Sequence, residues 1–69
     1  MNRKMRRMAQ DAVEFSKECY FQMQEHGIDS MAENEQASAR CFEELLHTSL
    51  SEIEIGLICC ARGYTYKQA

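Results

Sequence analysis

The sequence contains no proline, no tryptophan and only three glycines in 69 residues. Proline and glycine interrupt helices most often, so their scarcity favours long helices over sheets or disorder. No apolar run approaches the ~20 residues that a membrane-spanning helix needs. The basic N-terminus is followed by Gln10, Asp11 and Glu14 instead of the apolar stretch of a secretory signal. These absences predict one helical domain over 1–69, in the cytoplasm of a bacterial or virus-infected cell and not in a membrane.

The sequence also lacks the patterns of catalytic and metal centres. It has no glycine-rich phosphate loop, no His-Glu-x-x-His and no Cys-x-x-Cys pair. The two histidines, His26 and His47, are far apart along the chain. A chain this short also has little room for a concave pocket. We therefore expect no enzyme activity, no cofactor, no catalytic residue and no metal ligand.

Four cysteines, Cys19, Cys41, Cys59 and Cys60, are enough for two disulfides. Without a secretion signal we expect them to stay reduced. Three of them fall on apolar helix faces, where cysteine packs as a small hydrophobic residue. A redox- or metal-responsive switch through these thiols is an alternative.

The charge is small overall but uneven along the chain. A net charge of -3 argues against a general nucleic-acid binder. Half of the eight basic residues, however, lie in the first seven positions: Arg3, Lys4, Arg6 and Arg7. This basic turn is either a solvated helix end or a contact for nucleic acid or an acidic partner.

Hydrophobic periodicity predicts three helices, at about 2–26, 31–47 and 50–62. In the first helix the apolar residues fall on one side and the charged residues on the other. Phe21 is the exception on the polar side, and a large exposed aromatic residue suggests contact with another molecule. Gly27 and Gly63 are expected to end the first and third helices.

Two serine–glutamate pairs have the spacing of capping boxes, namely Ser30 with Glu33 and Ser49 with Glu52. They predict where the second and third helices begin. The short connection after Gly27 predicts that the first two helices form a hairpin. Thr48 and Ser49 are expected to end the second helix, because their side chains can form hydrogen bonds with the local backbone.

The third helix is apolar on nearly every side, which is typical of a buried helix. One face is expected to form the core and carries Leu50, Ile53, Leu57, Cys60 and Ala61. A second face carries Ile55, Ile58 and Cys59, and two other helices cannot cover both. Because a small chain has little stability to spare, we expect a second copy to cover this second face. The expected interface of the homodimer consists of Phe15, Cys19, Phe21, Ile55, Ile58 and Cys59.

The segment 50–69, LSEIEIGLICCARGYTYKQA, resembles the first half of the helix-turn-helix of LuxR-type response regulators. The residues that match are Leu50, Ser51, Glu54, Leu57, Ala61, Gly63, Thr65, Lys67, Gln68 and Ala69. The resemblance implies a helix, a glycine and a turn. The sequence ends where the recognition helix would begin, so we do not expect base reading in the major groove.

The start MNRKMRR, the short length and the acidic helices with cysteine and methionine are similar to small helical early proteins of lambdoid phages, of the exo–xis region type. That resemblance implies a regulatory or accessory protein that acts mostly by interaction. We therefore expect a non-enzymatic homodimer that binds a host or phage protein. A transcriptional regulator that contacts nucleic acid through its basic N-terminus is the alternative.

Overall fold

The computed structural model describes residues 1–64, which form three α-helices and one short 3₁₀ turn. These are α1 (Arg3–His26), η1 (Ile28–Ser30), α2 (Glu33–Leu46) and α3 (Glu52–Ala61). The predicted all-α fold is confirmed, and each helix boundary lies within two residues of its expected position. None of the described helices is long and apolar enough to cross a membrane.

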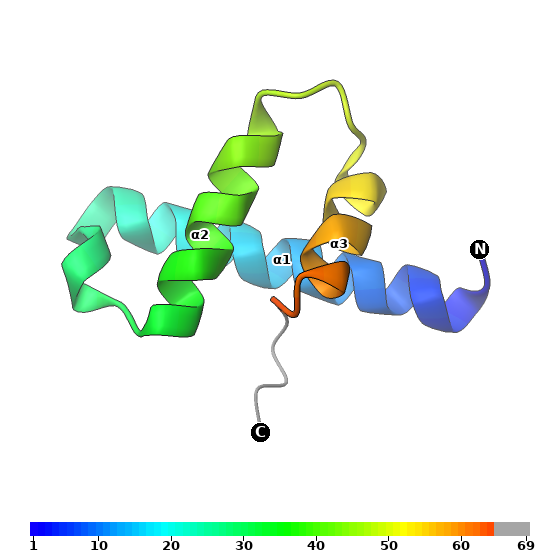
Figure 1. Ribbon diagram of the computed structural model, residues 1–69, viewed down its shortest axis with the longest axis horizontal. Coiled ribbons are helices and arrows are strands. Elements are labelled where there is room, and N and C mark those ends of the chain that lie inside the picture. Colours follow the sequence, from blue (N-terminus) through cyan, green and yellow to red (C-terminus); the bar gives the residue numbers. More distant parts are fainter. Residues whose placement is uncertain (65–69) are drawn as a thin grey trace.

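The long helix α1 forms one layer of the molecule, and α2 and α3 form the other (Figure 1). Both shorter helices lie on the same side of α1 and cross it steeply, so α2 does not run alongside α1 as in a parallel-sided hairpin. The result is a flat molecule of 37 × 31 × 16 Å. As Figure 1 shows, the N-terminal turns of α1 extend beyond α3.

The start of α1 and the start of α2 have different caps. At α1 the side-chain oxygen of Asn2 accepts a hydrogen bond from the Met5 amide at 2.8 Å. The predicted cap of α2 by Ser30 is wrong, because the Ser30 hydroxyl donates back to the Gly27 carbonyl at 2.9 Å and lies within η1. Instead α2 begins after Ala32, whose amide donates to the Glu35 carboxylate at 3.1 Å.

The capping box of α3 lies two residues later than predicted. Ser51 and Glu54 bond reciprocally, with the Glu54 amide donating to the Ser51 hydroxyl and the Ser51 amide donating to the Glu54 carboxylate. The delay has a cause in Thr48. Its hydroxyl donates to the Leu45 carbonyl and accepts from the Leu50 amide, which holds the chain in a turn between the helices.

Glycine ends α1 and α3, as predicted. Gly27 has φ 88° and Gly63 has φ 85°, a region that favours glycine. After α3 the amide of Gly63 donates to the Cys60 carbonyl and the amide of Tyr64 donates to the Cys59 carbonyl. These two bonds form a Schellman motif, and they return Tyr64 to the core.

The core consists of two clusters along the inner face of α1. The larger lies where all three helices meet and contains Ala12, Val13, Cys41, Phe42, Leu45, Ile55 and Cys59. The smaller lies between α1 and the start of α2 and contains Cys19, Met31 and Ala39, with Phe15 and Met23 against it.

The two layers approach closely where α1 crosses α3, at Ala9 and Gly56. A Cβ atom added to Gly56 would overlap the carbonyl oxygen of Ala9 and lie 2.7 Å from its carbonyl carbon. Ala9, Ala12 and Ser16 are all fully buried on the α1 side of this crossing. Small residues on both helices therefore set the depth at which α3 lies on α1.

Candidate functional site

The inner face of α1 continues past α3 without a cover. Met5 lies about one helical turn before Ala9 and Met8 about one turn before Ala12, so the two methionines extend the face that the core uses. Ala9 and Ala12 are fully buried, whereas Met5 and Met8 are 47% and 48% exposed. The inner face of α1 therefore carries small buried residues where α3 covers it and large exposed residues where it does not.

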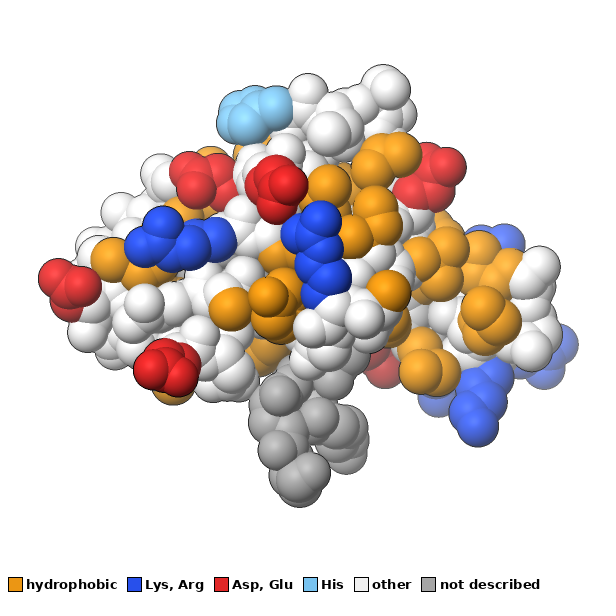
Figure 2. All heavy atoms as spheres, in the orientation of Figure 1, with side chains coloured by type: hydrophobic (Ala, Val, Ile, Leu, Met, Phe, Trp, Pro, Cys, Tyr) orange, Lys and Arg blue, Asp and Glu red, His pale blue; other side chains and the backbone are white. Residues whose placement is uncertain are grey.

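The exposed flank of α3 borders these methionines. Met5, Met8, Leu57 and Cys60 together line an open apolar depression of about 160 Å³, which we call the methionine patch. The Cys60 thiol donates to the Met8 carbonyl at 3.3 Å and connects the two helices that line the patch. Figure 2 shows hydrophobic side chains gathered over α3 and the adjoining part of α1.

Charged residues surround the methionine patch unevenly. Lys4 and Arg6 flank Met5 in sequence, and both are exposed. Asp11 lies towards the other end of the patch. Burial of the Cys60 thiol, and to a smaller extent the negative charge of Asp11, raises the pKa of Cys60. The rim is therefore basic at the N-terminal end of α1 and acidic beside α3.

The four basic residues of the N-terminus lie on the first turns of α1, and all are exposed. A helix N-terminus carries a partial positive charge, so Arg3, Lys4, Arg6 and Arg7 oppose the helix dipole there. No acidic residue in the first turn compensates for them. The placement costs the isolated helix stability and leaves its N-terminal end strongly basic and exposed.

The predicted assignment of the two faces of α3 is wrong for Ile55 and Cys59, whereas Leu50 and Cys60 pack against the core as expected. Ile55 and Cys59, expected on the outer face, are 5% and 0% exposed within a single chain. Ile58 is half-buried against the same core cluster. Conversely, Leu57 lies at the exposed flank, and Ala61 is exposed. The physical reason is Gly56, which must face α1 at the close crossing and so turns its neighbours Ile55 and Cys59 inward.

The remaining residues of the expected interface separate into two groups. Cys19 is buried at 3% exposure and Phe15 packs beside it in the smaller cluster. Neither Cys19, Ile55 nor Cys59 offers a surface to a partner while the chain keeps this fold. Phe21 is 55% exposed, as predicted, and its ring lies 5.6 Å from that of Tyr20. The structure thus does not bring the six residues together on one surface.

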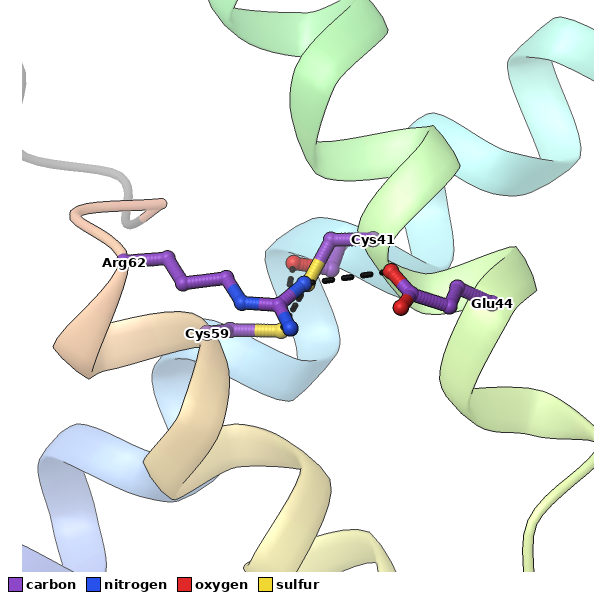
Figure 3. A network of polar contacts seen from close by, with 5 residues as sticks. Cys41, Glu44, Cys59 and Arg62 are labelled. Carbon is purple, nitrogen blue, oxygen red and sulfur yellow. Dashed lines mark hydrogen bonds and ion pairs between the residues drawn. The ribbon is translucent and has the colours of Figure 1, made fainter.

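Cys41 and Cys59 meet at the centre of the larger core cluster, where their sulfur atoms lie 3.7 Å apart (Figure 3). The Ser16 hydroxyl donates to Cys59 Sγ at 3.4 Å. Arg62 donates to Cys41 Sγ at 3.3 Å and to the Glu44 carboxylate at 3.2 Å. Burial, with a smaller contribution from Cys59, raises the pKa of Cys41 to about 11, although Arg62 opposes the shift. All four cysteines are free thiols in this structure.

Sequence reasoning missed Gly56 and Arg62. A glycine inside an otherwise apolar helix is a signal of close helix packing, and it was the available clue to the orientation of α3. Arg62 had no comparable signal, because its role depends on how α2 and α3 come together.

Within residues 1–64, no group of three or more histidine, cysteine or acidic side chains is arranged to hold a metal ion. Up to Tyr64, the segment that resembles a LuxR-type motif consists of α3 followed by the turn at Gly63. The matching residues Thr65, Lys67, Gln68 and Ala69 lie outside the described residues. Comparison with family models, curated proteins and solved structures finds no significant match.

Proposed function

We propose that the protein is a small non-enzymatic regulatory or accessory protein that acts by binding, and that its first partner is a second copy of itself seated on the methionine patch. The observation that carries the proposal is the uncovered continuation of the α1 core face at Met5 and Met8. Flexible, polarisable methionine side chains suit an interface that must adapt to a partner surface. The resemblance to phage accessory proteins, which act mostly by interaction, agrees with this class of function.

The charges around the patch favour a second copy as the occupant. Lys4 and Asp11 are seven residues apart, so they lie on the same side of α1 with Met8 between them. Antiparallel pairing of two α1 helices about an axis near Met8 would place Lys4 of one copy opposite Asp11 of the other. The patch is thus complementary to itself, which is what a twofold interface requires.

Burial supplies the driving force for this pairing. Removing a methionine or leucine side chain from water stabilises an association by about 1.5–3 kcal/mol for each fully buried side chain. Met5, Met8 and Leu57 would contribute from each copy. A host or phage protein that uses the same patch would compete with self-association.

Sedimentation equilibrium over a wide range of protein concentration tests the proposal. We expect a reversible dimer, weakened by Lys4→Glu and by Asp11→Lys. The double variant should recover part of the affinity, because the charges again face opposite charges across the axis. Glu25→Lys makes the same charge change as Asp11→Lys at an exposed position about 21 Å farther along α1. It is the matched control and should leave association unchanged. A monomer at every concentration, or a double variant no better than the single ones, would refute this pairing.

The second candidate is a nucleic-acid-associated regulator, supported by the four exposed basic residues on the first turns of α1. It predicts binding to a DNA or RNA duplex that weakens steeply with salt. Fluorescence anisotropy with labelled duplexes at low salt measures this directly. Binding that survives Met8→Glu but is lost in Arg3→Glu with Arg7→Glu would favour this candidate over self-association.

A further inference from the structure

Cys41 and Cys59 are arranged as a pair that can be joined covalently. They come from different helices, α2 and α3, and are separated by 18 positions in the sequence. Their sulfur atoms are already in van der Waals contact at 3.7 Å. A disulfide bond of about 2.05 Å would require the sulfurs to approach by less than about 2 Å, which small rotations of both side chains and a slight shift of α3 can supply.

The surroundings of the pair include one movable cover. Cys59 is fully buried and Cys41 is 3% exposed, so small molecules do not reach either sulfur directly. Arg62 crosses the pair from the end of α3, and its side chain is 43% exposed in its ion pair with Glu44 (Figure 3). Surface ion pairs of this kind contribute little stability, so Arg62 can leave without unfolding the core.

We propose that Cys41 and Cys59 form a reversible disulfide when the protein meets a low-molecular-weight disulfide, and that Arg62 covers the pair in the reduced protein. The observation behind the proposal is the sulfur–sulfur contact between two helices that otherwise pack mainly on α1. It is independent of the methionine patch and of the proposed dimer.

The reaction balances as thiol–disulfide exchange. Cys41 loses its proton to solvent, and its thiolate attacks one sulfur of the small disulfide, which releases one small thiolate that takes up a proton. The Cys59 thiolate, formed in the same way, then attacks Cys41 Sγ and displaces the second small thiol. Two protein thiols are oxidised to one disulfide, and the small disulfide is reduced to two thiols.

One neighbouring donor assists this exchange, because the Ser16 hydroxyl donates to Cys59 Sγ and such a bond favours the thiolate form. The guanidinium of Arg62 also donates to Cys41 Sγ, but Arg62 must leave before the reagent enters, so this bond is lost at the moment of attack. Burial acts in the other direction and holds the pKa of Cys41 at about 11. The pair should therefore exchange slowly at neutral pH and faster when Arg62 is removed.

The product would connect α2 to α3 across the 48–50 turn. A disulfide of this loop length restricts the unfolded chain, so folding and oxidation should favour each other. At a fixed ratio of oxidised to reduced glutathione, we expect the ratio of disulfide to dithiol to be on the order of a hundredfold higher in the folded protein than in the urea-unfolded protein.

The test is a glutathione redox titration of the full chain, with acid quench, alkylation of free thiols and mass analysis after cleavage at glutamate. We expect one intramolecular disulfide that joins the peptide of Cys41 to the peptide of Cys59 and Cys60. Cys19→Ser and Cys60→Ser should leave this disulfide in place, and Cys41→Ser should abolish it. Arg62→Gln should speed its formation severalfold.

Three results would overturn the proposal. The folded protein could stay fully reduced in oxidised glutathione while the urea-unfolded protein oxidises. The disulfide could instead map to Cys60 or Cys19. Equal disulfide-to-dithiol ratios in the folded and unfolded protein would show that the native contact makes no contribution. The comparison of folded with unfolded wild-type protein needs no variant, so it holds even if Cys41→Ser fails to fold.

Discussion

The inner face of α1 is used in two different ways along its length. In its middle the face carries Ala9, Ala12 and Ser16, all fully buried under α3 and α2. Near the N-terminus it carries Met5 and Met8, each about half exposed. Small residues allow two helices of one chain to approach closely, whereas long flexible side chains suit a surface that another molecule covers. The contrast separates the part of the face that builds the fold from the exposed part that we propose as the binding surface.

The largest expected effect comes from Gly56→Ala, which would disrupt the packing of α3 on the middle of the inner face of α1. An exposed helix position normally gains about 0.5–1 kcal/mol from this change, since alanine favours helix. Here the new methyl group overlaps the Ala9 carbonyl, so we expect a loss of at least about 3 kcal/mol, or failure to fold. Urea unfolding followed by circular dichroism measures the change. A stability equal to or above wild type would show that α3 does not approach α1 at Gly56.

The next effect distinguishes the two sides of α3. Ile55→Ala should lower the free energy of unfolding by about 2–5 kcal/mol, because Ile55 is buried in the core. Leu57→Ala should cost the single chain less than about 1.5 kcal/mol, because its cavity opens to solvent. Urea unfolding at low protein concentration compares the two variants. The opposite order would restore the face assignment that the sequence suggested.

The positions of the helices along the chain were predictable from the sequence, whereas the orientation of α3 was not. Proline scarcity, glycine stops and periodicity place α1 and α2 because each has one clear apolar face. α3 has apolar residues on nearly every side, so periodicity alone cannot tell which side faces α1. The decision depends on Gly56 meeting the backbone of Ala9, a contact between distant parts of the chain. The exposed Phe21 and basic N-terminus were predictable, but the methionine patch needed the position of α3.

A third effect concerns the buried thiols of the covered region. Burial raises the pKa of Cys19 and of Cys41 to about 11, from an ordinary value of 9.0. The unfolded chain therefore releases these protons at lower pH than the folded chain. Stability should be constant up to about pH 9 and then fall as the pH rises towards 11. Urea midpoints measured across this range should show the fall, with a shallower slope in Cys19→Ala.

The smallest expected effect concerns the basic residues at the exposed N-terminal end of α1. Arg3→Glu should stabilise the isolated chain by about 0.3–1 kcal/mol, because a carboxylate suits the N-terminus of a helix. Thermal unfolding at low protein concentration measures this gain, and Arg40→Glu in α2 gives the matched charge change away from the helix start. If Arg3→Glu were as neutral as its control, the basic residues would not be opposing the helix dipole.

The most direct test of the account is the molar mass of three proteins by light scattering: wild type, Met8→Glu and Phe21→Glu. Both variants place a carboxylate at an exposed apolar position of α1, but on opposite faces. We predict twice the chain mass for wild type and Phe21→Glu, and a folded single chain for Met8→Glu. A wild-type monomer at all concentrations, or dissociation by Phe21→Glu and not by Met8→Glu, would contradict the assignment of the methionine patch as the binding surface.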